Sequence, residues 1–439
     1  MPHMRGGGVK PSADLSTAMT REISSERFRD RFDRFNEIGA TDRGGVNRPS
    51  LSDANRRARD KLVEWFEEAG LTVTVDEVGN IFGRREGKDD DLTPVLVGSH
   101  VDSQYNGGRY DGVIGVLGAL EGIETLNDIG VETERPIEAV SWSNEEGVRF
   151  QPDMLGSGVF AGTFETEFAY DLEDKEGKTF GEELKRIGYR GDAPCEPRDL
   201  HSYFELHVEQ GPTLEDAGLS VGVVEGVYGF IWFDAAFTGS ADHAGPTPMH
   251  LRHDALMATS DVVEAVRRIA GTEGEDLVGT VGSLDVSPNS INVIPERVDF
   301  TVDFRSYDDE TVDRAADSVR TEIDHAAARE GVEGEYEQIM RIDSQSFDGD
   351  CVETVAAAAD ALDAEHTRLV SGAGHDASYL NGVCPTAMVF VPSVSGVSHT
   401  EDEFTEWEDA VTGANVLFNA VLEKASEPAD WDGAGATNA

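Results

Sequence analysis

The sequence predicts an α/β protein with a second, α+β unit inserted into it. Buried strands alternate with helices up to about residue 218 and again after residue 344, an order typical of a sheet covered by helices. Between these parts the order strand, helix, strand, strand, helix, strand is typical of a split βαβ unit. We expect a first domain over 22–218 and 344–425, an inserted domain over 219–343, and loose termini at 1–21 and 426–439.

The first part reads as alternating helices and strands. Helical periodicity covers 53–70 and ends at a glycine, and alternation over 71–87 predicts a pair of strands. The runs TPVLVGSH and PIEAVSW are apolar enough for buried strands, and each leads into polar residues. Between them, 112–128 predicts a helix with small residues on one face. Ligands bind beyond the carboxyl ends of strands in such sheets, so the polar strand ends are the expected site.

The inserted part has a different order of expected strands and helices. We expect one long strand over 221–240, a helix over 254–271 and strands over 276–288 and 290–306. A helix over 309–331 and a strand over 334–343 complete the split βαβ order. After it, 351–365 predicts a helix and 385–393 a buried strand of the first sheet.

Composition excludes several classes of protein. The net charge is −50 over 439 residues, but the 39% apolar content and the periodic segments argue against disorder. Such a negative surface would repel nucleic acid, and the abundance of acids is typical of proteins from salt-accumulating cells. Three scattered cysteines predict no disulfide framework. We see no signal peptide, and the apolar run 112–120 is too short to cross a membrane, so we expect a cytoplasmic protein without a membrane partner.

Four side chains with ligand chemistry fall at predicted strand ends. His100 ends one strand, Asp111 opens the following helix, and Glu145 and Glu146 follow the next strand. Imidazole and carboxylate ligands that converge at one sheet edge suit divalent transition metals. A bridging carboxylate can hold two such ions, an arrangement used for hydrolysis. Asp102 would then orient the His100 ring without binding the metal itself.

The adjacent glutamates cannot share one role. Neighbouring side chains on an extended segment point in different directions, so one can bind metal while the other takes a proton from water. The residues alone do not say which is which, and a solvated acidic turn in an acid-rich chain is the alternative. His207 in ELHVEQGP and His399 in GVSHTEDE are further candidate ligands, whereas His3, His201 and His325 fit surface positions.

The motifs resemble the metal-dependent amidohydrolase branch of the M20 peptidase clan. This branch holds N-carbamoyl-L-amino acid hydrolases, β-ureidopropionase and allantoate amidohydrolase. The resemblance covers about 25–425 and rests on GSHVDSQYNGGRYDG, SNEEGVRF, ELHVEQGP, ADHAGPTPM, PNSINVIPERVDFTVDFR, GAGHDA and GVSHTEDE. The clan's peptidases carry an Asp ligand about two dozen residues after the paired glutamates. Here His207 stands in that role, which favours the amidohydrolases.

The resemblance implies a zinc-peptidase-like catalytic domain with a binuclear metal site. Asp111 would bridge two divalent ions per subunit: zinc, or manganese, cobalt or nickel. The terminal ligands would be His100, Glu146, His207 and His399. Glu145 would be the general base.

The resemblance also implies a ferredoxin-like lid that carries part of the active site and forms a homodimer. His243 would stabilise the oxyanion from the other subunit of the dimer. Asn292 and Arg305, expected on one strand segment, would grip the substrate. Gln210 and the backbone at Gly372 and Ala373 would line the pocket, with Arg252 and His375 as weaker candidates. From the residues alone, Arg305 fits a salt-bridged surface site better than a binding site, and Asn292 fits a position beside a turn. Arg252 and His375 fit structural hydrogen bonding equally well.

The expected activity is hydrolysis of the carbamoyl C–N bond of N-carbamoyl-L-amino acids or related ureido acids. Allantoate and β-ureidopropionate remain alternatives within the branch. An M20 aminoacylase or dipeptidase, which cuts a plain amide, is disfavoured by HVEQGP. A non-catalytic binding protein is the alternative from another class, but the five ligand positions and the expected base are all present.

Overall fold

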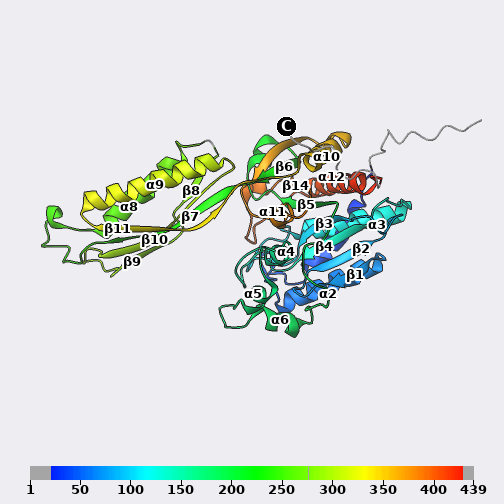
Figure 1. Cartoon of the computed structure of the whole chain (residues 1–439), viewed down its shortest axis with the longest axis horizontal. Coiled ribbons are helices and arrows are strands. Elements are labelled where there is room, and N and C mark those ends of the chain that lie inside the picture. The colour runs from blue at the N-terminus through cyan, green and yellow to red at the C-terminus, as the bar shows by residue number, and fades with distance from the viewer. Residues whose placement is uncertain (1–20, 275, 429–439) are drawn as a thin grey trace, which may run out of the picture.

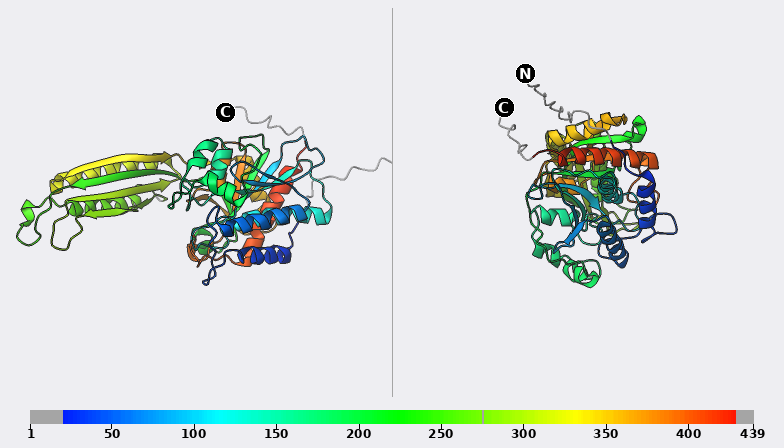
Figure 2. Two further views of the ribbon diagram at one scale, coloured as in Figure 1. Left: turned by 90° about the horizontal axis from the view of Figure 1, so that it is seen from below. Right: turned by 90° about the vertical axis from the view of Figure 1, so that its right-hand side faces the viewer.

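Figure 1 shows the computed structural model of the chain, which describes residues 21–274 and 276–428. Within these residues the strands form a nine-stranded mixed sheet and a separate five-stranded sheet. The five-stranded sheet and its two helices project from the larger part as an elongated arm (Figures 1 and 2). Each sheet has a hydrophobic core of its own.

The nine-stranded sheet places four parallel strands at its centre. Its strands are β1 (Thr72–Val75), β2 (Ile81–Arg85), β3 (Val95–His100), β4 (Ile137–Trp142), β5 (Ser202–Val208), β6 (Val221–Val227), β12 (Gln345–Ser346), β13 (His366–Ser371) and β14 (Thr386–Val391). The order is β1-β2-β4-β3-β5-β14-β6-β12, with β13 on β6. Because β4, β3, β5 and β14 are parallel, their carboxyl ends meet at one edge, where the predicted ligands lie.

Helices enclose this sheet. They are α1 (Ser25–Asn36), α2 (Asp53–Glu68), α3 (Val113–Ile129), α4 (Leu155–Phe160), α5 (Thr166–Asp171), α6 (Phe180–Ile187), α7 (Thr213–Ala217), α10 (Gly349–Ala361), α11 (Asp376–Leu380) and α12 (Trp407–Ala425). Helices α1, α3, α12 and α10 contact one another in that order as one layer, whereas α11 packs against α4 and against β5 and β14. Thirteen of the seventeen residues of α3 are buried, because both the sheet and α12 cover it.

The second sheet has the strand order of a split βαβ unit. Its strands are β7 (Gly229–Thr238), β8 (Val278–Thr280), β9 (Leu284–Ser287), β10 (Arg297–Ser306) and β11 (Glu333–Ile342), and its helices are α8 (Ala255–Ala270) and α9 (Asp309–Glu330). The order is β11-β7-β10-β8, and β9 also pairs with β10, so the strand expected over 276–288 is broken in two. Helices α8 and α9 contact each other and bury one face of the sheet.

Several expectations about boundaries need correction. The single strand expected over 221–240 is two strands, and the first of them, β6, belongs to the nine-stranded sheet. The second sheet therefore spans 229–342. Asn292 does not share a strand with Arg305, because it lies in a turn before β10 begins at Arg297.

The chain ends follow the expectation only in part. Of the termini expected to be loose, 1–20 and 429–439 lie outside the described residues. The described ends are bonded: Arg21 exchanges hydrogen bonds with Asn419, and Glu427 contacts His201 and Lys424. Among the described residues, none of the helices combines the length and apolar character needed to cross a membrane.

Candidate metal centre and active site

Two buried histidines face the same carboxylate oxygen. Nε2 of His100, at the end of β3, and Nε2 of His207, in β5, each lie 3.1 Å from Oδ1 of Asp111. Nδ1 of His100 donates to the backbone carbonyl of Asp102, and Nδ1 of His207 donates to that of Val208, both at 3.0 Å. A neutral imidazole that donates from Nδ1 carries a lone pair on Nε2, so both rings aim lone pairs at the Asp111 carboxylate.

The close approach of the helix to His100 depends on a glycine. Gly112 caps α3 with a φ of 66°, and a Cβ there would lie 2.4 Å from Nε2 of His100. A side chain at this position would fill the space in front of the imidazole. The glycine therefore fits both the backbone conformation and the space around the ligand atoms.

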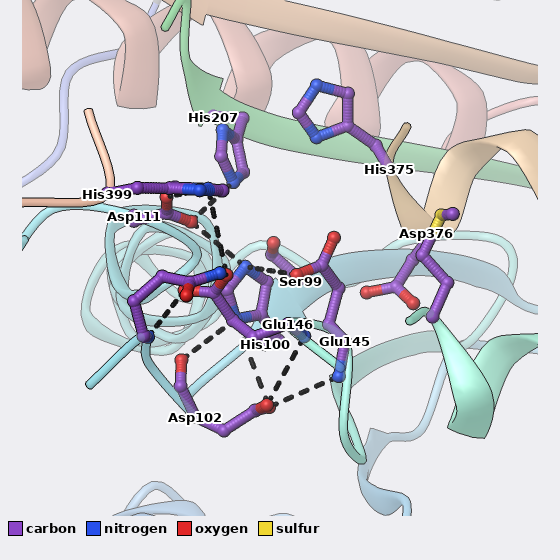
Figure 3. Close-up of polar contacts among 12 residues, drawn as sticks. Ser99, His100, Asp102, Asp111, Glu145, Glu146, His207, His375, Asp376 and His399 are labelled. Atoms are coloured by element: carbon purple, nitrogen blue, oxygen red, sulfur yellow. Dashed lines mark hydrogen bonds and ion pairs between the residues drawn. The ribbon is translucent and has the colours of Figure 1, made fainter. Parts of the chain in front are cut away.

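A second group of ligand atoms uses the other oxygen of Asp111. Nε2 of His399 lies 3.4 Å from Oδ2 of Asp111 and 3.6 Å from Oε2 of Glu146. Nε2 of Gln210 donates to Oδ2 of Asp111 at 3.0 Å. Gln104 fixes Glu146 through its backbone N–H at 2.9 Å and its side-chain amide at 2.6 Å. Asp111 thus belongs to both groups (Figure 3).

The donor set fits two divalent cations. Within the described residues, the two groups with metal-ligand spacing are His100–Asp111–His207 and Asp111–Glu146–His399. Nε2 of both His100 and His207 is buried and makes no hydrogen bond of good geometry among these residues. Two lone pairs that face a carboxylate across about 3 Å repel it unless a proton or a metal cation lies between them, so the site can hold a cation. Mixed imidazole and carboxylate ligands suit zinc, manganese, cobalt or nickel.

Glu145 lies beside the first group but belongs to neither group. Its Oε2 is 3.3 Å from Nε2 of His100. Burial raises the pKa of the Glu145 carboxyl well above its usual range, and the nearby Asp376 and Glu146 raise it further. For Asp111 burial acts in the same direction, but as long as no metal is bound His207 and His100 can be protonated, and in that form they hold the pKa of Asp111 well below its usual value. The pKa values of the neighbouring Glu145 and Asp111 carboxyls are therefore shifted in opposite directions, a pattern common at catalytic sites.

Asp102 contacts the site differently from the expectation. Its backbone carbonyl, rather than its carboxylate, accepts from His100, and Oδ1 lies 4.0 Å from Nδ1. The carboxylate instead accepts the backbone N–H groups of Glu145 at 3.4 Å and Glu146 at 3.3 Å. Figure 3 shows Asp102 beneath this pair. The residue thus fixes the turn that separates the two glutamate side chains.

Sequence reasoning missed several residues that support the centre. Gln104, Ser398 and Glu403 hydrogen-bond to ligand residues, Glu205 acts electrostatically on His207, and Asp376 does so on Glu145. Ser99, next to His100, donates to Glu205 at 2.7 Å. His375, a weaker candidate, is buried with its ring centroid 4.5 Å from that of His207. In a chain with 86 acidic residues, nothing local distinguishes the acids that matter.

The residues expected from the inserted part lie away from the metal centre. His243 follows the far end of β7, where it forms a bridge with Val293, and the N–H of Ala244 donates to the carbonyl of Asn292. Arg252 donates to the carbonyls of Thr247 and Ala244, so its contacts here hold the loop around His243. From Arg297 to Ser306, β10 spans about 30 Å, so His243 is too far out to reach this chain's own metal centre.

Arg305 lies at the opposite end of β10, near the first sheet. It pairs with Asp303 at 2.9 Å and its guanidinium lies 5.3 Å from the ring centroid of Phe230. Gly372 and Ala373 follow β13, where the N–H of Ala373 donates to Oγ of Ser371 at 3.2 Å. These positions are compatible with a pocket wall, without a direct contact to the ligand groups.

The fold and the site together define a class of protein. A sheet that gathers two ligand groups around one shared carboxylate, beside a buried carboxyl of raised proton affinity, is typical of metal-dependent hydrolases. The chain belongs to the peptidase family M20/M25/M40, whose profile matches residues 96–423.

Several individual relatives are similar to this chain over most of its length. An N-carbamoyl-L-amino-acid amidohydrolase of Rhizobium meliloti is 45% identical over 92% of this chain and 97% of its own length. One from Geobacillus stearothermophilus is 41% identical over 92% of this chain and 99% of its own. The crystal structure of a hydantoinase/carbamoylase family amidase from Burkholderia multivorans superimposes with a TM-score of 0.89 at 50% identity, and the match covers 93% of this chain and 99% of that one.

Proposed function

We propose that this chain is a binuclear metal-dependent amidohydrolase that cleaves the carbamoyl C–N bond of N-carbamoyl-L-amino acids. The observation that carries the proposal is the pair of ligand groups around Asp111. The relatives named for this activity at 41–45% identity, which match almost full length, support the choice of substrate class. The net charge of −50 supports an enzyme that binds no nucleic acid, because a phosphate backbone would be repelled.

His100 and His207 would hold one ion with Asp111, and Glu146 and His399 would hold the other. When bound, divalent cations polarise a substrate carbonyl and acidify water. Glu145 then takes a proton from the attacking water and transfers it to the departing nitrogen. Its burial and its place beside His100, outside both ligand groups, support this role. The products are the free amino acid, ammonia and carbon dioxide.

The substrate carboxylate would be bound from the inserted part. Arg305 suits it because a guanidinium can donate to two oxygens at once. Asn292, Gln210 and the backbone at Gly372 and Ala373 would supply further polar contacts. Gln210 already donates to Asp111, which supports its place at the pocket floor.

We further propose that 229–342 is a lid and dimerisation domain that supplies His243 to the partner's site. The distance of His243 from this chain's own metal centre supports action across a dimer. The test mixes two inactive variants, E145Q and H243A, after unfolding and refolding together. Random pairing should restore about a quarter of wild-type activity, since half of the dimers are mixed and each has one complete site. An inactive mixture would contradict action in trans.

A substrate panel tests the proposed reaction. Metal-stripped protein, reloaded with zinc, manganese, cobalt or nickel, is assayed against N-carbamoyl-L-amino acids, β-ureidopropionate, allantoate and N-acetyl amino acids. We expect the highest kcat/KM with an N-carbamoyl-L-amino acid, and weaker turnover of its D-enantiomer. Preference for allantoate or ureidopropionate would instead assign the chain one of the other activities of the same branch. Preference for the acetyl compounds would overturn the proposal.

A further inference from the structure

Glu403 is a buried acid that the proposed mechanism does not use. It lies four residues after His399, before α12, and only 3% of its surface is exposed. Its carboxylate packs directly on the glycine-rich loop that leads to Asp111. A Cβ added to Gly108 would lie 2.1 Å from Cδ and Oε1 of Glu403, so the loop backbone and the carboxylate are in direct contact.

The two oxygens of Glu403 contact different loops. Oε1 accepts the backbone N–H of Tyr110 at 2.9 Å and that of Asp111 at 3.1 Å. Oε2 accepts the hydroxyl of Ser398, the neighbour of His399, at 2.8 Å. Oγ of Ser398 also lies 3.4 Å from Oδ2 of Asp111. One carboxylate therefore joins the loop before α3 to the loop after β14, two segments nearly 290 residues apart in the chain.

In the second ligand group Gln104 holds Glu146, whereas the side chain of His399 contacts only Gln210, Asp111 and Glu146 among the polar groups of the described residues. His399 has a half-exposed side chain and a φ of 58°, a left-handed conformation that surrounding contacts must hold in a residue other than glycine. In the first group, by contrast, His100 and His207 are buried and each is fixed by a backbone carbonyl. Loss of Glu403 would thus remove support from Asp111 and His399 while leaving those two histidines in place.

We propose that Glu403 is a positioning residue that sets the spacing between Asp111 and His399 and so determines the affinity of the second cation. It touches neither ligand's side chain and acts through the backbone N–H of Asp111 and the hydroxyl of Ser398. The inference rests on the proposed binuclear centre. Residues that orient metal ligands typically change metal affinity by about 10–100-fold when they are removed.

The test compares wild type, E403A, E403Q and a control, E401A. Glu401 lies in the same loop, two residues away, and its ion pair is with Arg43 rather than with the centre. Each protein is stripped of metal and titrated with Zn²⁺ or Mn²⁺ against a competing chelator, and bound metal is counted by mass spectrometry. Circular dichroism and thermal unfolding report folding separately.

We expect wild type and E401A to bind two ions. E403A should bind the second ion about 10–100-fold more weakly. The first ion should lose less affinity, because it shares Asp111 but is also held by His100 and His207, which keep their own backbone contacts. E403Q has the same shape, and its amide can still accept from both N–H groups and donate to Ser398, so its second affinity should stay within about threefold of wild type. This rescue separates positioning by hydrogen bonds from loss of charge.

The outcomes are distinguishable. Two unchanged affinities in folded E403A would overturn the inference, and so would an equal loss of the second ion from E403A and E403Q. If E403A does not fold, E403D, whose side chain is one methylene shorter, replaces it with the same expected loss. Fewer than two ions on the wild-type protein would instead overturn the proposed metal centre.

Discussion

At the scale of single residues, the site depends on neighbours with different environments. Glu146 is fixed by Gln104 and belongs to a ligand group, whereas Glu145 lies outside both groups against His100. Asp102 holds the backbone N–H groups of both. Adjacency in the chain therefore brings the proposed proton acceptor next to a proposed ligand, and the turn directs the two carboxyls apart.

Replacing Glu145 with Gln should separate catalysis from metal binding. We expect E145Q to lose about 10²- to 10⁴-fold in kcat, because an amide cannot accept the proton of water. Metal content should stay at the wild-type value, since Glu145 is in neither ligand group. Steady-state kinetics and metal analysis check this, with the exposed Glu176 as E176Q for control. Wild-type turnover by E145Q would exclude it as the base.

Asp76 is expected to make the stability of the fold depend on pH. Asp76 is fully buried, and burial raises its pKa from 3.8 to about 6. Between these values the folded state keeps a proton that the unfolded state has lost, so the stability that Asp76 contributes falls as pH rises. The difference in unfolding free energy between wild type and D76N should decrease by about 3 kcal/mol from pH 3.8 to 6 and then level off. Urea unfolding measures it; a difference that is flat or rises with pH would contradict the assignment.

At the scale of elements, α3 carries Asp111 to the metal centre through close packing on the sheet. Its small residues let it approach β5, and the tolerance differs along the helix. A Cβ at Gly115 would lie 2.4 Å from the carbonyl oxygen of Leu206, whereas a Cβ at Gly118 would have its nearest neighbour at 3.4 Å. Backbone atoms at the first position cannot move aside without shifting the strand or the helix.

This difference gives a matched pair of variants. G115A should move the start of α3 away from β5, lower the melting temperature and weaken metal binding, because Asp111 closely precedes the helix. G118A should be neutral or stabilising by up to about 1 kcal/mol, since alanine favours helix over glycine. Thermal unfolding and metal titration of both proteins test this. Equal behaviour of the two variants would show that the close approach does not matter.

At the scale of the whole molecule, the large negative charge affects the stability of the fold. The net charge of −50 is spread over two units that the chain joins twice, at Tyr228 between β6 and β7 and at 343–344 between β11 and β12. Repulsion among exposed carboxylates opposes compact folding at low ionic strength. The acidic surface is therefore expected to make stability depend on salt.

The melting temperature should rise as KCl is increased from about 0.01 M to 1 M, because the screening length falls from about 30 Å to about 3 Å over that range. Activity should rise with it. Most of the increase in melting temperature should occur below 1 M salt. If screening is the cause, choline chloride should raise the melting temperature as KCl does. A melting temperature that does not respond to either salt would contradict the halophilic interpretation of the composition.

The sequence by itself determined the alternation of elements, the split βαβ order and the residues with ligand chemistry. Periodicity and strand-end placement depend on local sequence, so the order of residues along the chain is enough to select His100, Asp111, Glu145 and Glu146. Boundaries were less certain: 221–240 is one apolar stretch, and only sheet pairing divides it into β6 and β7.

The tertiary structure alone decided which polar groups support the centre. Glu403 and Gln104 act through contacts with residues distant in the sequence, and the chain has too many acids for composition to distinguish them. For Asp111 and His243 the family resemblance had already implied a shared ligand and a role across a dimer, and the structure adds the positions of the side chains. The physical reason is the same in each case: ligand spacing and reach are distances between elements, and only packing of the whole chain sets them.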